Sequence, residues 1–175
     1  MLNALRRTSE KARLVQALNQ ALTAQSRLPV FYREYGVADT IDGRFDMLCL
    51  HAWLVLSRLK SAGEQEVAQL LSDAIIVAFD EALRDLGAGD MGMGPRMKKL
   101  GNAFNGRLNA YEAAADDESL ADAILRNVYR GDAAHAQEAI AMARYARAAR
   151  LKLEAGDPAT GTLEFGAPTT TFDRS

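Results

Sequence analysis

Apolar residues recur at helical spacing along most of the chain. In the first such segment, about 9–26, Leu14, Leu18 and Leu22 are four residues apart and therefore share one face of a helix. The sequence contains no convincing pair of strands with alternating apolar and polar positions. The pattern therefore predicts an all-α fold, with helices at about 9–26, 30–35, 40–62, 64–86, 95–115, 118–130 and 133–155.

Glycines and short polar residues mark the expected helix boundaries. A glycine often follows a helix because it adopts the left-handed conformation without a steric penalty. Such glycines follow periodic segments at Gly36, Gly63, Gly87, Gly131 and Gly156. Starts are expected where a short side-chain oxygen accepts hydrogen bonds from the first turn, at Thr8 or Ser9, Asp39, Asp117 and Asp132.

The chain of 175 residues is long enough for one domain with a buried core. We expect about six to seven helices in an irregular bundle. Residues 1–28 are predicted to form a basic N-terminal helix packed on the body, and residues 29–155 to form the helical domain. The sequence after Gly156 has no helical period, so residues 156–175 are predicted to form an irregular C-terminal tail.

The segment 40–62 is apolar nearly all round, which is typical of a central helix buried on every side. Trp53, the only tryptophan, is therefore expected to be buried, whereas an exposed Trp53 would be the main anchor for a partner. His51 lies on the same apolar surface. A lone histidine there is more often a hydrogen-bonded core or rim residue than a haem ligand. Cys49, the only cysteine, is expected to be a small buried apolar residue.

Two features of the next helices have more than one interpretation. Ile76 and Val77 fall toward the acidic face of the helix at 64–86, where they form a partner contact or reflect a helix that is buried more broadly. Gly101 and Gly106 lie inside the helix at 95–115, and each destabilises it by about 1 kcal/mol relative to alanine. A close approach of a neighbouring helix, or a kink, is the expected compensation.

The net charge of −2 offers no electrostatic footprint for DNA, but the charges are unevenly distributed. Residues 1–33 contain six basic side chains and one acidic one, whereas residues 64–90 contain seven acidic side chains and one basic one. Arg96, Lys98 and Lys99 form a basic group that either contacts phosphate, ribosomal RNA or lipid headgroups or is a solvated first turn.

No set of residues in the chain is typical of an active site. Asp42 and Asp46 are one helical turn apart, but acids in the first turns of a helix more commonly stabilise its positive end than bind a metal. Two histidines and one cysteine are too few for the usual zinc sites, and no Gly-x-Ser-x-Gly motif occurs. We therefore predict a non-enzymatic protein without a metal or a cofactor.

The longest charge-free apolar run, residues 47–57, is far shorter than the roughly 20 residues that a membrane-spanning helix needs. Membrane contact is therefore expected to be peripheral.

The segment 39–63 and the residues after it carry the most distinctive motifs. The segment combines Asp39-Thr40 with Phe45, Leu50-His51-x-Trp53 and Arg58-x-Lys60. FDEALRDLGAGD follows at 79–90, and then come Lys98-Lys99 with Phe104, Tyr111, and Leu125-Arg126-Asn127 near Tyr129. In this order and at this spacing, residues 29–131 resemble the ubiquinol–cytochrome c chaperone family.

The resemblance implies a non-enzymatic helical chaperone that binds newly made cytochrome b and promotes assembly of the ubiquinol–cytochrome c reductase (cytochrome bc) complex. Mitochondrial members are associated with a small helical partner and with the ribosome, and these are further expected partners. The start of the sequence suggests a bacterial-type member. Its expected place is the bacterial cytoplasm, with peripheral contact at the inner membrane, or the matrix side of that membrane in a eukaryote.

A chaperone of this kind needs an accessible apolar surface next to charged residues. We expect that surface around His51, Trp53, Ile76, Val77 and Phe104, with Lys98, Lys99 and Arg126 at its edge. The alternative hypothesis is a helical adaptor with a basic face, which docks on the ribosome or on an anionic membrane and has no dedicated client.

Overall fold

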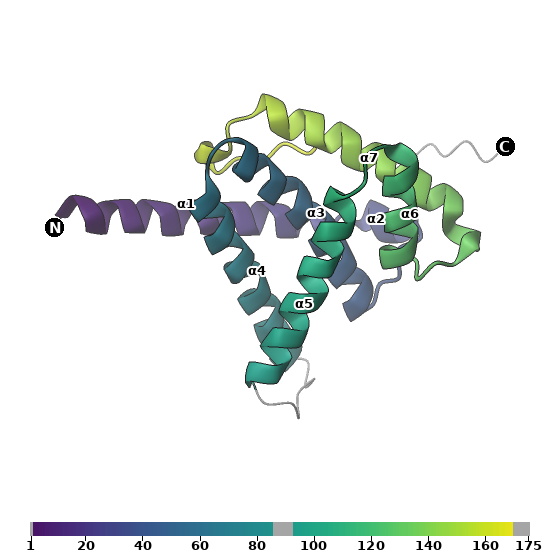
Figure 1. Ribbon diagram of the computed structural model, residues 1–175, viewed down its shortest axis with the longest axis horizontal. Helices are drawn as coiled ribbons and strands as arrows, with labels where there is room; N and C mark the ends of the chain where they lie inside the picture. Colours follow the sequence, from purple (N-terminus) through teal and green to yellow (C-terminus); the bar gives the residue numbers. More distant parts are fainter. Residues whose placement is uncertain (1, 86–92, 170–175) are drawn as a thin grey trace.

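The computed structural model describes residues 2–85 and 93–169, and every regular element in these ranges is helical (Figure 1). This confirms the prediction of an all-α fold. The α-helices of the described ranges are α1 Leu2–Ser26, α2 Pro29–Arg33, α3 Ile41–Ser61, α4 Gln65–Asp85, α5 Met93–Glu112, α6 Asp117–Val128 and α7 Ala136–Ala155. Two short 3-10 helices are added at Ala133–His135 and Pro158–Thr160.

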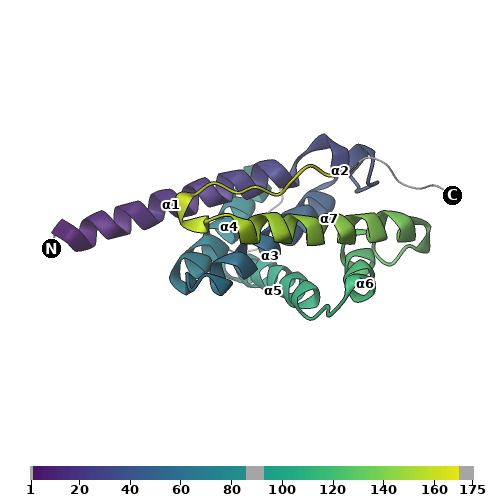
Figure 2. The same cartoon turned by 90° about the horizontal axis from the view of Figure 1, so that it is seen from above.

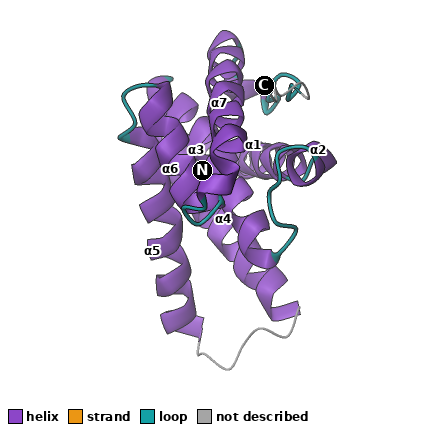
Figure 3. Cartoon of the chain, turned by 90° about the vertical axis from the view of Figure 1, so that its right-hand side faces the viewer, coloured by secondary structure: helices purple, strands orange, loops and turns teal. Residues whose placement is uncertain are grey.

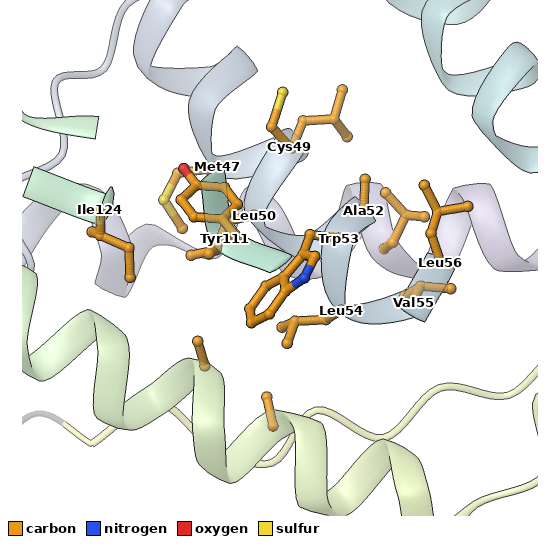
Figure 4. Packing of buried hydrophobic residues seen from close by; sticks show 14 of the residues in the cluster. Met47, Cys49, Leu50, Ala52, Trp53, Leu54, Val55, Leu56, Tyr111 and Ile124 are labelled. Atoms are coloured by element: carbon orange, nitrogen blue, oxygen red, sulfur yellow. The ribbon is translucent and has the colours of Figure 1, made fainter. Parts of the chain in front are cut away.

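The central helix of the bundle is α3, which contacts α1, α4, α5, α6 and α7. Residues on all of its sides are buried, which confirms the interpretation of its apolar sequence. Figure 4 shows Met47, Leu50 and Trp53 of α3 near Tyr111 of α5, and the rings of Trp53 and Tyr111 are 5.7 Å apart. The core is therefore arranged around this one helix.

α1 packs on α3 and α4 through Leu18 and Leu22, which are fully buried, and Val15. Its N-terminal half extends beyond the other helices (Figures 1 and 2). The helix already starts at Leu2, so the predicted start at Thr8 or Ser9 is wrong. Helical spacing identified the buried face of α1, but the polar run at residues 6–11 separates Leu2 and Leu5 from that periodic pattern.

α4 and α5 project from the centre as a pair (Figures 1 and 3). Arg96 Nε donates to Asp80 Oδ1 at 2.5 Å and joins the two helices. Most of the glycine-rich segment 87–94 that connects them lies outside the described residues. The hydrogen bond to Asp80 turns Arg96 toward α4, so only Lys98 and Lys99 of the predicted basic group are exposed.

The expected close helix contact at the α5 glycines is wrong for Gly106. A Cβ atom added at Gly106 would meet nothing within 4 Å, and one added at Gly101 would meet only Ile76 Cδ1 at 4.0 Å. Gly106 lies on the exposed side of α5, so no neighbouring backbone requires a glycine there.

The last described segments pack back over the bundle. α6 packs against α7, and Asp116, one residue before the predicted cap, accepts from Ser119 N at the start of α6. After α7, residues 156–169 return along α1 and α7 (Figure 2). None of the helices in the described ranges is long and apolar enough to span a membrane.

Candidate functional site

Three residues of the predicted partner surface are in the core, so the prediction that they form an accessible surface is wrong. His51 and Phe104 are fully buried and Trp53 is 3% exposed. Trp53 Nε1 donates to Glu112 Oε2 at 2.7 Å, and the Arg150 guanidinium lies over its ring at 5.8 Å. Phe104 is on the stripe of α5 that faces the core. A periodic pattern locates such a stripe, but it does not show which neighbour covers it.

The other predicted residues are accessible to different degrees. Val77 is 45% exposed, and Ile76 is half-buried near Gly101. Lys98 and Lys99 are exposed at the start of α5, whereas Arg126 is exposed on α6, which follows the other end of α5. A helix of 20 residues is about 30 Å long. Arg126 is therefore separated from the lysines by most of α5, and the role of these residues in partner binding stays a prediction.

His51 is part of a continuous chain of hydrogen bonds. Its Nδ1 lies 2.8 Å from the carbonyl oxygen of Met47, and its Nε2 lies 2.9 Å from Tyr145 Oη. Because a carbonyl only accepts, Nδ1 carries the proton and Nε2 accepts from the Tyr145 hydroxyl. Gln25 Nε2 in turn donates to Tyr145 Oη at 3.0 Å. The network therefore joins α1, α3 and α7 and suits a neutral His51, as the sequence predicted for a lone core histidine.

The stability of the fold should depend on pH through His51. Burial lowers the pKa of His51 from 6.5 to about 4, against the opposite effect of its bond to Met47. Between these values the unfolded chain binds more protons than the folded chain. The contribution of the neutral His51 to the free energy of unfolding is therefore complete above pH 6.5. As the pH falls from 6.5 toward 4, the free energy of unfolding decreases by about 3 kcal/mol.

Urea unfolding between pH 4 and 7 measures this effect against His51→Gln. The glutamine does not titrate in this range, and its amide oxygen still accepts a hydrogen bond. The free energy of unfolding of the unmodified protein should fall more steeply with decreasing pH than that of the variant. Equal slopes would rule out His51 as the titrating group.

A second buried polar cluster surrounds Asp46, which is completely buried. Arg107 Nε of α5 donates to Asp46 Oδ1 at 2.6 Å, and Arg130 Nη1 lies 2.8 Å from Asp46 Oδ2. Burial raises the pKa of Asp46, and the two guanidinium groups oppose this increase. Arg130 adopts a φ of 59°, which is uncommon for a residue other than glycine. Asp46 is thus a structural link between α3, α5 and the turn after α6, rather than a residue that stabilises the start of α3.

The described residues offer little for metal or nucleophilic chemistry. They contain no group of three His, Cys, Asp or Glu side chains placed to hold a metal ion. Cys49 is buried, as predicted, and burial raises the pKa of its thiol well above the ordinary value. A thiol that stays protonated is a poor nucleophile.

Two of the exposed large apolar residues, Leu70 and Ile140, lie in grooves between helices. One groove of about 430 Å³ runs between α1 and α4, with Val15 and the exposed Leu70 in its lining and Arg7, Lys11 and Glu66 beside them. The groove therefore combines apolar side chains with charged side chains at its border.

A second groove of about 500 Å³ runs along the surface where α6 and α7 meet. Ile140, which is 37% exposed, and Leu125 lie in it next to Glu118, Asp122 and Arg144. Ile140 lies outside the buried face of α7, which contains mainly alanine. The structure therefore adds apolar surface that periodicity did not indicate.

The comparisons with known proteins agree with this architecture. The model of the ubiquinol-cytochrome c chaperone family matches residues 33–160. The crystal structure of the Cbp3 homolog from Brucella abortus is similar over 92% of this chain and 93% of that chain, with 34% sequence identity and a TM-score of 0.79. Among curated protein sequences, none matches.

The chain belongs to the ubiquinol-cytochrome c chaperone family. This confirms the resemblance found in residues 29–131, and the family match extends it to residue 160. The protein is accordingly a chaperone of cytochrome bc assembly, and membership in a chaperone family implies a non-enzymatic role.

Proposed function

We propose that the protein binds newly made cytochrome b and holds it until it assembles into the ubiquinol–cytochrome c reductase complex. The observation that carries the proposal is the family match over residues 33–160, together with the 34% identity to the Cbp3 homolog over nearly the whole of both chains. Cytochrome b is the client that we propose because its long apolar segments need cover before they reach their partners.

The surface is suited to this task. The grooves beside Leu70 and Ile140 contain apolar residues and are bordered by charged side chains, whereas most of the described aromatic residues are buried. A chaperone must release its client, and small apolar contacts give modest affinity. We further propose that the protein acts in the bacterial cytoplasm, with peripheral contact at the inner membrane and, as additional partners, the ribosome or a small helical protein.

Deletion of the gene tests the proposal. The amount of assembled cytochrome bc complex should fall several-fold, while other respiratory complexes stay near normal, and a plasmid copy should restore it. A tagged copy should retain newly made cytochrome b in a short labelling pulse. An unchanged amount of complex, with a tagged protein that retains only anionic vesicles in a salt-sensitive manner, would instead support an adaptor without a client.

A further inference from the structure

The C-terminal strap, residues 161–169, crosses several helices that are distant in sequence. A Cβ atom added at Gly161 would lie 3.2 Å from Ala17 Cβ of α1, and one added at Gly166 would lie 3.6 Å from Lys152 Cγ of α7. At its end, the Tyr35 hydroxyl donates to the carbonyl oxygen of Thr169 at 2.9 Å. The strap therefore lies over α1 and α7 and reaches the residues after α2.

Phe165 is the strap residue that enters the core. Its ring is 5% exposed and lies edge-on to His51, with the centroids 5.4 Å apart. His51 in turn packs against Phe31 at 5.3 Å and Tyr145 at 5.7 Å. We call Phe31, His51 and Tyr145 the aromatic seat. His51 is thus covered by the chain's own C-terminal strap.

The strap is attached almost entirely through side chains. Among the described residues, no backbone-to-backbone hydrogen bond joins residues 162–169 to a helix. The main attachments are the Phe165 ring, the half-buried Leu163 and the Tyr35–Thr169 hydrogen bond. Segments with few backbone bonds and few buried side chains open at a small fraction of the global unfolding cost. The strap can therefore leave the aromatic seat while the helices stay folded.

The seat suits a specific kind of occupant. It accepts one aromatic ring from an extended segment, and the residues that follow this ring in the strap are small or rigid, Gly166, Ala167 and Pro168. The floor is aromatic, and its polar atoms are already bonded to one another, since His51 and Tyr145 are paired. An apolar segment that carries Phe, Leu or Met satisfies such a surface without leaving a polar group unpaired.

We propose that the aromatic seat is a client-binding surface, and that an extended apolar segment of the client displaces the strap and inserts a large apolar side chain where Phe165 lies. This inference rests on the proposed function, because the client is newly made cytochrome b. When no client is present, Phe165 of the strap occupies the aromatic seat and covers it.

Substitution of Phe165 in the full-length chain tests the competition. The probe is cytochrome b translated in vitro in the presence of the tagged chain. Phe165→Ala should retain at least about fivefold more cytochrome b than the unmodified chain, because the competing occupant is removed. Phe165→Leu, which keeps the seat filled, and Glu164→Ala on the exposed side of the strap should retain near-normal amounts. Unchanged or reduced retention by a folded Phe165→Ala variant would overturn the proposal.

Crosslinking with a photoreactive benzophenone side chain shows where the client binds, and it does not depend on the Phe165 variants. Lys152 lies next to the strap, and Asn105 is exposed on α5. With either position replaced in an otherwise unmodified chain, crosslinks to cytochrome b should form from position 152 and not from position 105. Crosslinks from position 105 alone would refute the seat but leave the proposed function intact. Failure of the tagged chain to retain any cytochrome b would refute the proposed function itself.

Discussion

Replacing Arg107 with alanine is expected to lower the free energy of unfolding by about 3 kcal/mol at pH 7. The arginine is the closer of the two cations that face the buried carboxylate of Asp46, and it lies over the Phe45 ring at 5.0 Å. Removing one partner of a buried ion pair leaves an uncompensated charge, which costs about 3–5 kcal/mol. We expect the lower value of this cost because the Arg107 side chain is 21% exposed and because Arg130 still lies beside the Asp46 carboxylate.

The pH dependence identifies the cause of this loss. Without Arg107, the pKa of Asp46 should rise further, so the folded variant takes up a proton more readily than the unfolded chain. The deficit relative to the unmodified protein should therefore be smaller at pH 5 than at pH 7 in urea unfolding. Arg126→Ala, an exposed arginine on α6, is the matched control and should change stability by less than about 0.5 kcal/mol.

A double variant separates charge from packing. Asp46→Leu combined with Arg107→Met removes both charges, and apolar replacement of a buried pair is often neutral or stabilising. The double variant should recover most of the stability lost in Arg107→Ala. A double variant as unstable as Arg107→Ala would mean that the loss comes from packing around Phe45 rather than from a buried charge.

The helices themselves could be predicted from the sequence because their signal is local. Apolar spacing of three or four residues fixes which face of a helix is buried, and α6 and α7 follow that rule, whereas α3 is apolar and buried on all sides. The N-caps of α3 and α6 were predicted to within one residue, because Thr40 caps α3 next to the predicted Asp39 and Asp116 caps α6 next to Asp117, whereas Asp132 caps the 3-10 helix Ala133–His135 before α7. In α1, the polar residues 6–11 interrupt the apolar spacing between Leu5 and Leu14.

The candidate site could not be predicted because it depends on contacts between distant residues. His51 was correctly interpreted as a hydrogen-bonded core histidine, yet its cover comes from Phe165, in a segment without helical period. Asp46 was assigned to the first turns of its helix, but its partners Arg107 and Arg130 are more than sixty residues away. Periodicity describes one helix at a time, whereas exposure depends on which other segment packs against it.

Gly43 and Gly106 should respond in opposite directions to the same substitution, although both lie within α-helices. A Cβ atom at Gly43 would lie 2.0 Å from the carbonyl oxygen of Ala38, which accepts from Thr40 N at 2.9 Å. Alanine there must push this backbone away and disturb the cap in which Thr40 Oγ1 accepts from Gly43 N at 3.1 Å. The strain and the lost cap outweigh the better helix propensity, so Gly43→Ala should destabilise by about 2 kcal/mol.

Gly106→Ala should instead stabilise the protein by about 1 kcal/mol, because its Cβ meets nothing within 4 Å and alanine is the better helix former. Thermal and urea unfolding of the two variants measure the difference, which should be about 3 kcal/mol. Comparable stability of the two variants would mean that the 34–40 loop moves freely and that Gly43 is not required for space. A large loss at Gly43 alone would show that the loop is held rigidly against the first turn of α3.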